Sequence, residues 1–274
     1  MALIFRAPGA TKPALEYSAR LCLNPTMRAW VVVGLVGALA PLGAASERFS
    51  SGASRVSVIE LFTSEGCSSC PPADRWLGSL RDKPGLWTEF VPIEFHVSYW
   101  DSLGWKDRLS TREFTAREYA YASAWGSSNV YTPCFVRNGE EWKPEWGTPG
   151  GAAARTGQLS VEIADDGVCR AEFMPGPAAR AAPDGFELHV AVLGGGISSR
   201  VTAGENKGET LGHEFVVLGL ANRAFPRDSG NAAVRTEVAL PQPIAAPAAR
   251  RAIAVWVTRR GELAPVQATG GWLP

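Results

Sequence analysis

The sequence has no excess charge of either sign, few histidines and few cysteines. Its 274 residues include 27 Lys plus Arg and 27 Asp plus Glu, so the formal net charge is zero. A nucleic-acid-binding protein needs a basic face that displaces counterions, so that class of partner is not expected. Three His, five Cys and a single Cys-x-x-Cys do not provide the ligand spacing of a zinc site. We therefore predict no metal site and no cofactor from these residue types.

The composition also argues against a disordered chain and against a helical bundle. Hydrophobic residues make up 46% of the sequence, which is too many for a polyacidic, disordered chain. The 20 Pro and 29 Gly favour a loop-rich protein that contains strands. A length of 274 residues is typical of one or two domains with a sizeable core.

Long apolar runs are absent except near the N-terminus. Met27-Arg28 is followed by an apolar stretch and by small residues ending near Ala45, a pattern typical of a secretory signal peptide at 27–45. We expect residues 1–26 to be an extension ahead of a start at Met27. The alternatives are an uncleaved anchor and a buried strand, but the run is short for a membrane span and contains Gly and Pro. The sequence thus predicts a periplasmic or secreted protein with no membrane span after signal removal.

Residues 54–146 predict a first domain in which strands and helices alternate. The expected elements are a strand at Arg55–Thr63, a helix at Pro71–Arg81, a strand at Glu89–Val97, a helix opened by the capping box Ser110–Glu113, and a hairpin at Asn138-Gly139. A strand–helix–strand unit gives parallel strands and the hairpin adds antiparallel ones. The sequence therefore predicts a mixed sheet flanked by helices.

A different periodicity begins after residues 147–158, which are rich in Gly, Pro and Ala and are typical of a linker. From residue 159 to 274, apolar residues alternate with polar ones in several runs, as at Leu188–Val192, Val234–Leu240 and Ile253–Val257. This period of two predicts an antiparallel β-sandwich-like domain.

Cys67 and Cys70 lie where the first predicted strand ends and the first predicted helix begins. A thiolate just before a helix N-terminus faces free N–H groups and the positive end of the helix dipole, and both lower its pKa. Cys67 is then the attacking thiol and Cys70 the resolving thiol of disulfide exchange. The alternative is an inert structural disulfide in an exported protein.

Several motifs resemble those of one family, the exported, thioredoxin-like family of unknown function numbered twelve-twenty-three. The stretches that carry the resemblance are Val58–Asp74, Phe95–Asp107, Val130–Pro133 and Ala203–Gly208. The resemblance covers nearly all of the chain after the signal peptide. It implies an export route, a redox cysteine pair and, over Arg55–Trp142, a thioredoxin-like domain. The predicted fold class is therefore an α/β thioredoxin-like domain followed by a β-sandwich-like domain.

The same resemblance implies roles for residues outside the Cys-x-x-Cys. Thr132-Pro133 matches the proline loop that faces the reactive cysteine, so Pro133 is a candidate catalytic residue and Thr132 a candidate substrate-binding residue. Two positions depart from the family pattern, because Cys134 replaces the usual Gln and Ser98 replaces an Asp. Cys134 either competes for Cys67, pairs with Cys169 or packs as a small apolar residue.

Three further residues have both a functional and a structural interpretation. Glu60 lies in an apolar strand and resembles the buried acid that accepts a proton from the resolving thiol, or it belongs to a structural ion pair. His96 ends the second strand and either contacts substrate or is a hydrogen-bonded structural histidine. Trp100 lies in a loop near the expected site, where it offers an apolar platform or packs in the core.

The sequence therefore predicts a thiol–disulfide oxidoreductase that acts on cysteine-containing envelope proteins or a redox partner. The candidate catalytic residues are Cys67, Cys70, Pro133 and Glu60, and the candidate substrate-binding residues are Thr132, His96, Trp100 and Cys134. The alternative is a redox-inert binding module for a peptide, a glycan or a metal ion. The Glu205-Asn206-Lys207-Gly208 segment predicts a turn between strands, and the family resemblance leaves open a contact with the first domain.

Overall fold

The structure, a computed structural model, describes residues 46–180, 182–227 and 233–274. The predicted signal peptide at 27–45 and the extension ahead of it lie outside the described residues. In the part of the chain that is described, no helix has the length and apolar character needed to cross a bilayer.

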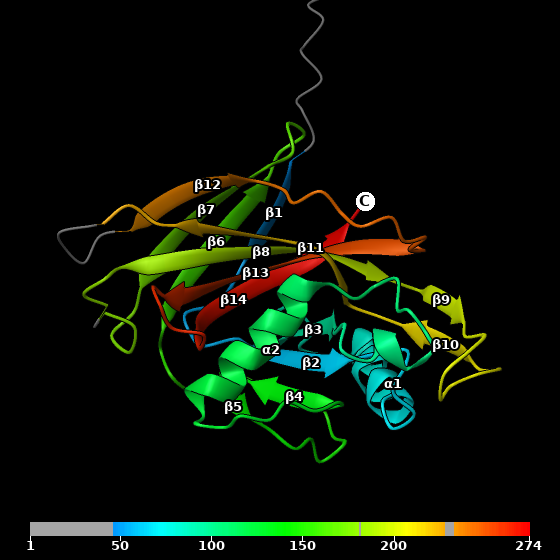
Figure 1. The fold of residues 1–274 in the computed structure, drawn as a ribbon. Coiled ribbons are helices and arrows are strands. Elements are labelled where there is room, and N and C mark those ends of the chain that lie inside the picture. The colour runs from blue at the N-terminus through cyan, green and yellow to red at the C-terminus, as the bar shows by residue number, and fades with distance from the viewer. Residues whose placement is uncertain (1–45, 181, 228–232) are drawn as a thin grey trace, which may run out of the picture. The chain divides into compact units, whose positions relative to one another are not determined.

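The strands of the described chain form three sheets (Figure 1). The largest has the order β14–β13–β8–β11–β3–β2–β4–β5. Its strands are β2 (Ser57–Thr63), β3 (Phe90–His96), β4 (Cys134–Arg137), β5 (Glu140–Glu141), β8 (Phe186–Gly195), β11 (Val216–Ala224), β13 (Arg250–Arg259) and β14 (Pro265–Leu273). A second sheet consists of β1 (Glu47–Ser50), β6 (Gly157–Ile163), β7 (Val168–Pro175) and β12 (Val234–Ala239). A two-stranded ribbon consists of β9 (Ile197–Arg200) and β10 (Thr210–His213).

The predicted fold class, a helix-flanked thioredoxin-like α/β domain followed by a β-sandwich-like domain, is wrong. The described chain is mostly β-sheet, and its two α-helices are α1 (Pro71–Ser79) and α2 (Arg112–Ala124). The reason is strand pairing. β11 lies parallel to β3, with Val216 opposite Glu94, and antiparallel to β8 on its other side. Because β11 joins the edge of β3, strands from both predicted domains form one eight-stranded sheet.

The local elements mostly agree with the sequence predictions. β2 and β3 are buried along their whole length and lie parallel, as expected of apolar strands joined through a helix. The predicted helix at Pro71–Arg81 is α1, followed by the 3₁₀ turn η1 (Leu80–Asp82). α2 begins at the N-cap Thr111, whose hydroxyl accepts a hydrogen bond from the Phe114 amide. A further 3₁₀ turn, η2 (Asp101–Leu103), precedes α2.

The hairpin at Asn138-Gly139 is also confirmed. Both residues have a positive φ, 55° at Asn138 and 93° at Gly139, which a tight turn between β4 and β5 requires. A Cβ at Gly139 would come within 2.6 Å of the Ala264 Cβ, so the turn packs closely on the chain ahead of β14.

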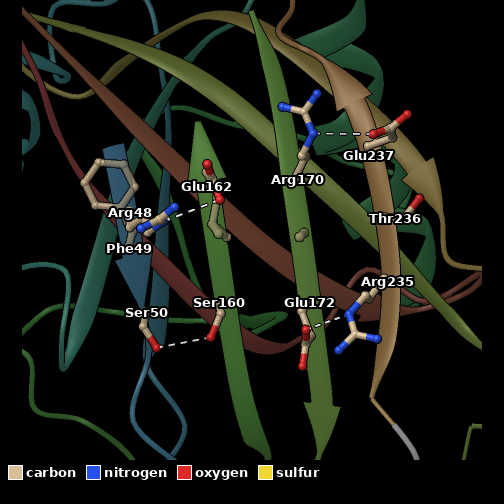
Figure 2. A pocket seen from close by; sticks show the side chains of 12 residues that line it. Arg48, Phe49, Ser50, Ser160, Glu162, Arg170, Glu172, Arg235, Thr236 and Glu237 are labelled. Atoms are coloured by element: carbon tan, nitrogen blue, oxygen red, sulfur yellow. Dashed lines mark hydrogen bonds and ion pairs between the residues drawn. The ribbon is translucent and has the colours of Figure 1, made fainter. Parts of the chain in front are cut away.

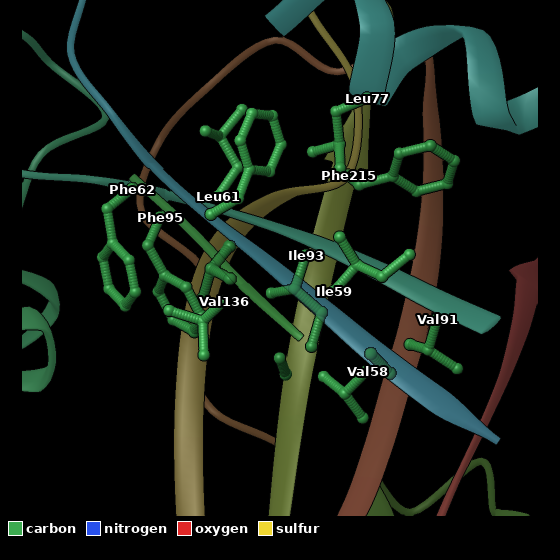
Figure 3. Close-up of a cluster of buried hydrophobic side chains, with 14 of the residues drawn as sticks. Val58, Ile59, Leu61, Phe62, Leu77, Val91, Ile93, Phe95, Val136 and Phe215 are labelled. Atoms are coloured by element: carbon green, nitrogen blue, oxygen red, sulfur yellow. The ribbon is translucent and has the colours of Figure 1, made fainter. Parts of the chain in front are cut away.

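The hydrophobic core on both faces of β2 and β3 draws on distant parts of the chain (Figure 3). Phe62 and Phe95 stack with ring centroids 5.4 Å apart. Leu77 of α1, Phe215 and Trp256 belong to the same cluster of buried side chains. A second cluster fills the space between the two large sheets, with Leu159, Val161, Phe173, Leu188 and Val255 among its members. Gly43–Pro274 accordingly makes one compact unit.

Candidate functional site

Cys67 and Cys70 lie at the junction of β2 and α1, and both are free thiols. The Cys67 amide donates to the Ser64 carbonyl at 3.1 Å, and the Cys70 amide donates to the Cys67 carbonyl at 3.2 Å, so two successive turns carry the chain into the helix. Pro71 and Pro72 occupy the first two helical positions, where an N–H has no intrahelical partner. The N-cap is Cys70 itself, so the resolving thiol of the predicted pair sits at the start of α1.

The two thiols have opposite acid–base properties. A hydrogen bond from Cys70 lowers the pKa of Cys67 to about 6, with a further contribution from Ser69 and against the opposing effect of burial. The Cys67 sulfur lies 3.2 Å from the Ser69 hydroxyl. Burial, followed by the hydrogen bond to Cys67, raises the pKa of Cys70 above its usual value. At neutral pH, therefore, Cys67 is the thiolate and Cys70 the thiol.

The Thr132-Pro133 loop closes over the cysteine pair. The peptide bond between these residues is cis. The Thr132 carbonyl lies 3.7 Å from the Cys67 sulfur and accepts a hydrogen bond from the Ser69 hydroxyl at 3.5 Å, and the Thr132 hydroxyl accepts one from the Trp100 indole at 2.8 Å. Five of the predicted site residues are thus brought together: Cys67, Cys70, Thr132, Pro133 and Trp100.

Glu60 lies away from the cysteine pair. Side chains alternate along a strand, so Glu60 and Thr63 of β2 point to opposite faces of the sheet. On the α2 face, the Glu60 carboxylate binds the Arg117 guanidinium through both oxygens, at 2.6 and 3.0 Å, and accepts a hydrogen bond from the Tyr121 hydroxyl at 2.5 Å. These contacts agree with the structural ion pair that the sequence left open.

Asp74 is the buried acid on the cysteine side of the sheet, and the sequence analysis missed it. It follows Cys70 by four residues, which is one helical turn, so both side chains face the same side of α1. The Thr63 hydroxyl donates to the Asp74 carboxylate at 2.7 Å, and Thr63 also contacts the Cys70 thiol. Burial, together with the charge of Glu94, raises the pKa of Asp74 to about 7. The helical spacing from Cys70 is the signal that would have identified this residue.

His96 belongs to a buried polar cluster next to the cysteine loop. Its Nδ1 lies 2.6 Å from the Asp107 carboxylate, and its Nε2 lies 2.8 Å from Glu94 Oε1. His213 Nδ1 lies 3.0 Å from the same Glu94 oxygen. We name the set Glu65, Glu94, His96, Asp107 and His213 the histidine cluster; each of its members is buried.

The charges of the histidine cluster balance in part. Burial disfavours a charged imidazole, yet the charge of Asp107 raises the pKa of His96 well above its usual value. Contacts with Glu65 and Glu94 similarly raise the pKa of His213 to about 9 against the effect of burial. The cluster is therefore a set of paired buried ions, so His96 is a hydrogen-bonded histidine and not an exposed substrate contact.

The segment Ala203–Gly208, between β9 and β10, holds the cysteine loop in place. The Asn206 side-chain amide donates to the Glu65 and Cys67 carbonyls, each at 2.9 Å. The Glu205 carboxylate accepts a hydrogen bond from the Ser68 amide at 3.0 Å. The predicted turn is present at Glu205–Gly208, and the contact with the first predicted domain that the resemblance left open is present as well.

Cys134 and Cys169 are free and buried in different core clusters. Cys134 opens β4 opposite Phe62, and burial raises its pKa to about 12. Burial likewise raises the pKa of Cys169 to about 12. These placements favour the interpretation of Cys134 as a small apolar residue of the core.

Access to Cys67 is closed in this conformation. Its exposed fraction is 0%, whereas the neighbouring Ser68 and Ser69 are exposed. The groups that cover the sulfur come from the Thr132 loop and from the turn itself. In this conformation the Cys67 sulfur is therefore not accessible to a second molecule.

A hollow of about 710 Å³ lies elsewhere, on the outer face of the sheet β1–β6–β7–β12 (Figure 2). Charged residues of adjacent strands pair across it, Arg48 with Glu162, Arg235 with Glu172 and Arg170 with Glu237. Exposed pairs of this kind contribute little free energy and leave few charges unmatched. The cysteine loop, not this hollow, is the candidate site.

The sequence that folds into this site has a match among known families. Residues 58–258 match a family described as a protein of unknown function (DUF1223). Because the match covers most of the sequence, the chain belongs to this family.

Two solved structures share the fold. An X-ray crystal structure of a protein from Agrobacterium tumefaciens has 25% sequence identity and a TM-score of 0.53, over 79% of this chain and 94% of that one. HBP35 of Porphyromonas gingivalis has 14% identity and a TM-score of 0.51, over 81% of this chain and 76% of that one. No curated protein matches the sequence.

Proposed function

We propose that the chain is an exported thiol–disulfide oxidoreductase that exchanges disulfides with cysteine-containing envelope proteins or a redox partner. The observation that carries the proposal is the division of acid–base roles between two free thiols in one turn. A pKa of about 6 keeps Cys67 as the thiolate at neutral pH, and the thiolate is the form that attacks disulfides. The pKa values of Cys134 and Cys169 are near 12, so both are protonated thiols at neutral pH.

In the first step, the Cys67 thiolate attacks one sulfur of a substrate disulfide. A bond forms between Cys67 and that sulfur, the substrate S–S bond breaks, and the other substrate sulfur leaves as a thiolate that takes a proton from water. Loss of the negative charge on Cys67 also removes the acceptor of the hydrogen bond from Cys70. The Cys70 thiol is then free to react.

In the second step, Cys70 loses its proton and attacks Cys67. The proton passes through the Thr63 hydroxyl to the Asp74 carboxylate, since Thr63 contacts both groups. The Cys67–Cys70 bond forms as the mixed disulfide breaks, and the second substrate sulfur leaves as a thiolate. Two electrons pass from the protein dithiol to the substrate, and the reverse sequence oxidises a substrate dithiol.

The residues around the pair suit a substrate backbone. Once the Ser69 hydroxyl releases it, the Thr132 carbonyl is an acceptor beside the Cys67 sulfur, and the Trp100 ring, held by the Thr132 hydroxyl, is only partly buried. Pro133 has no N–H, so the loop presents its carbonyl without a competing backbone donor. These features give Thr132, Pro133 and Trp100 a role in positioning an extended segment of substrate.

The proposed location rests on the sequence of residues 27–45, which is typical of a signal peptide. A periplasmic or secreted protein meets disulfide-containing partners in an oxidising compartment. Export and redox exchange therefore support one another as parts of the same proposal.

A redox titration tests the activity directly. Purified protein is equilibrated in buffers of varied glutathione ratio, and the free thiols are alkylated and located by mass spectrometry. We expect Cys67 and Cys70 to convert together between dithiol and disulfide, with Cys134→Ser titrating like the wild type. A pair that stays in one state at every ratio contradicts the proposal.

Partner capture then tests the substrate class. Cys70→Ser removes the resolving thiol, so mixed disulfides at Cys67 persist and can be identified after expression in the envelope. The matched control is the double variant Cys67→Ser/Cys70→Ser, which has no attacking thiol. Equal recovery of partners by both variants would exclude Cys67 as the nucleophile.

The complete burial of Cys67 favours one alternative, a redox-inert binding module for a peptide, a glycan or a metal ion. In that case the Trp100 loop and the surrounding surface bind the ligand and the cysteines serve only packing. The redox titration distinguishes the two functions, because an inert pair does not respond to the glutathione ratio.

A further inference from the structure

Three ligand-type side chains of the histidine cluster converge on one point. Glu94 and His96 lie two residues apart on β3, so they share a face of the sheet, and His213 ends β10. One ligand atom from each of the three lies within 4.8 Å of the others. Glu94 Oε1 lies 2.8 Å from His96 Nε2 and 3.0 Å from His213 Nδ1. In a metal site with bonds of about 2.0–2.1 Å, neighbouring ligand atoms are on the order of 3 Å apart.

The second nitrogen of each imidazole faces another carboxylate. His96 Nδ1 lies 2.6 Å from Asp107 Oδ2, and His213 Nε2 lies 3.6 Å from Glu65 Oε1. In metal centres, a ligating histidine usually presents its other ring nitrogen to a carboxylate or a carbonyl, which fixes the ring and its tautomer. Both histidines of this cluster have that arrangement.

The two outer carboxylates are themselves held in place. Asp107 accepts hydrogen bonds from the Glu65 amide at 2.9 Å and the Leu109 amide at 2.8 Å. Glu65 Oε2 accepts one from the Trp105 indole at 2.7 Å. The ring orientations are therefore set by contacts that do not involve Glu94, so the three converging atoms are positioned in advance.

An unpartnered atom in the cluster is the second indication of a missing ligand. Glu94 Oε2 is buried and has no hydrogen-bond partner among the described residues, whereas Glu65 Oε1 and His213 Nε2 face each other at 3.6 Å. Glu94 is completely buried, and its Oε1 serves two imidazoles while its Oε2 serves no group. A buried polar atom without a partner is costly, and such atoms call for an explanation. A cation at the convergence point would interact with the whole Glu94 carboxylate.

We propose that Glu94, His96 and His213 bind one divalent transition-metal ion of the zinc class, with Asp107 and Glu65 as the outer carboxylates that orient the two imidazoles. Imidazole and carboxylate are ligands that suit zinc, and three protein ligands leave a coordination position open. The ion takes the place of one proton on each imidazole, so two released protons are replaced by two positive charges. The net charge of the buried cluster stays the same.

The sequence does not reveal this site, because its ligands lie far apart along the chain. Glu94 and His96 are separated from His213 by more than a hundred residues, and the motif lacks the close spacing of known zinc signatures. Only the parallel pairing of β11 with β3, which carries the end of β10 toward the sheet, brings the ligands together.

Zinc titration of the purified chain tests the site. The protein is treated with a chelator, unfolded and refolded with Zn²⁺ so that burial does not block entry, and the metal content is measured by mass spectrometry after gel filtration. We expect one zinc per chain, and X-ray absorption of the wild type should show N and O ligands without sulfur. Zinc-free protein that refolds to the native circular dichroism spectrum under these conditions overturns the proposal.

Variants separate this site from the other possible ligands. His213→Gln and Glu94→Gln should weaken zinc binding by at least about 100-fold, and Asp107→Asn by about 10- to 100-fold. His189→Gln is the matched control, because His189 is also buried but binds Asn222 and Thr258 outside the cluster. The double variant Cys67→Ser/Cys70→Ser should keep its zinc. Zinc that is lost in the cysteine double variant but retained in Glu94→Gln assigns the ion to the cysteine pair and overturns the proposal.

Discussion

At the scale of single residues, one hydrogen bond gives two identical side chains different pKa values. Cys67 and Cys70 are both buried thiols, yet the pKa of Cys67 is low and that of Cys70 is high. The largest contribution to the first shift is the hydrogen bond that Cys70 donates. The Cys70 thiol thus stabilises the Cys67 thiolate, which is the division of roles that the proposed exchange reaction requires.

Replacing the donor should raise the pKa of Cys67. In Cys70→Ala the hydrogen bond to the Cys67 sulfur is lost, so we expect the pH midpoint of Cys67 alkylation by iodoacetamide to shift upward from about 6. Cys70→Ser keeps a hydroxyl donor and should retain a lower midpoint than Cys70→Ala. Rates of alkylation between pH 4 and 9, followed by mass spectrometry, measure the midpoint. Identical midpoints in the two variants would show that Cys70 does not set the acidity of Cys67.

Asp74 should make the metal-free protein less stable as pH rises. Its pKa in the folded chain is about 7, above the ordinary value of 3.8, so the folded state holds a proton that the unfolded state releases between these pH values. Stability is therefore greatest below pH 4 for this group and falls by up to about 4 kcal/mol as pH approaches 7. Asp74→Asn removes the titration, so we expect a higher Tm than the wild type at pH 8 and a smaller difference at pH 5.

The same variant bears on the proposed proton transfer. Asp74→Asn accepts a hydrogen bond from Thr63 but no proton, so resolution of a mixed disulfide at Cys67 should slow more than its formation. Glu60→Gln is the control on the opposite face of the sheet. It should lower the free energy of unfolding, because Arg117 loses its buried partner, and leave the resolution rate unchanged. If resolution slowed in Glu60→Gln and not in Asp74→Asn, Glu60 would be the proton acceptor.

At the scale of elements, the cysteine turn is held by the Ala203–Gly208 segment, which has no regular secondary structure of its own. Asn206 is buried and spans two carbonyls of the turn, and Glu205 binds the Ser68 amide from the exposed side. Gly204, with φ of 74°, lies where a Cβ would come within 3.1 Å of the Trp105 Cβ. The segment therefore couples the cysteine turn to the loop that carries Trp105.

Removing the Asn206 side chain should open the cysteine turn. In Asn206→Ala, the buried Glu65 carbonyl loses the donor on Asn206, at a cost of roughly 1–3 kcal/mol, and the Cys67 carbonyl keeps the Cys70 amide as its donor. We expect faster alkylation of Cys67 at a pH where its thiol is fully ionised, and faster hydrogen exchange in residues 65–70. Lys207→Ala changes an exposed neighbour and serves as the control. An unchanged alkylation rate in Asn206→Ala would mean that another segment limits access.

The sequence predicted these elements better than it predicted their contacts. The buried runs and the Asn138-Gly139 turn each encode a local conformation, and the structure has strands and a turn at those places. The helix predicted at the capping box Ser110–Glu113 is present too, but its N-cap is Thr111 and not Ser110. Glu60 and Asp74 are different, because the choice between them depends on which face of the sheet α1 covers. The four-residue spacing between Cys70 and Asp74 places these two side chains together, but packing on β2 and β3 decides which face of the sheet they meet.

At the scale of the whole molecule, the sheet pairing overrides the division that periodicity predicts. The change from helical to alternating patterns near residue 150 is real, but β11 adds to the edge of β3 and continues the sheet. The sequence of an edge strand does not show which strand will pair with it. The fold class could therefore not be predicted from the sequence, although most of the helices and strands could.

The shared sheet should make the N-terminal part of the chain unable to fold alone. A fragment of residues 46–146 would leave the β3 edge unpaired and remove Phe215, Val217 and Trp256 from the core cluster. We expect the fragment to lack a cooperative thermal transition by circular dichroism, whereas residues 46–274 unfold in one transition seen equally by tryptophan fluorescence. A fragment that unfolds cooperatively would instead support independent domains at the boundaries 54–146 and 159–274.

The bond between Asn206 and the cysteine turn has a consequence for biosynthesis. Asn206 reaches the Glu65 and Cys67 carbonyls across 141 and 139 residues of sequence. A growing chain emerges from its N-terminus first, so Cys67 and Cys70 leave the ribosome long before the residue that fixes their turn. During that interval they are ordinary cysteines of an unfolded segment. The cysteine turn can receive its two hydrogen bonds from Asn206 only after the chain has been made as far as that residue.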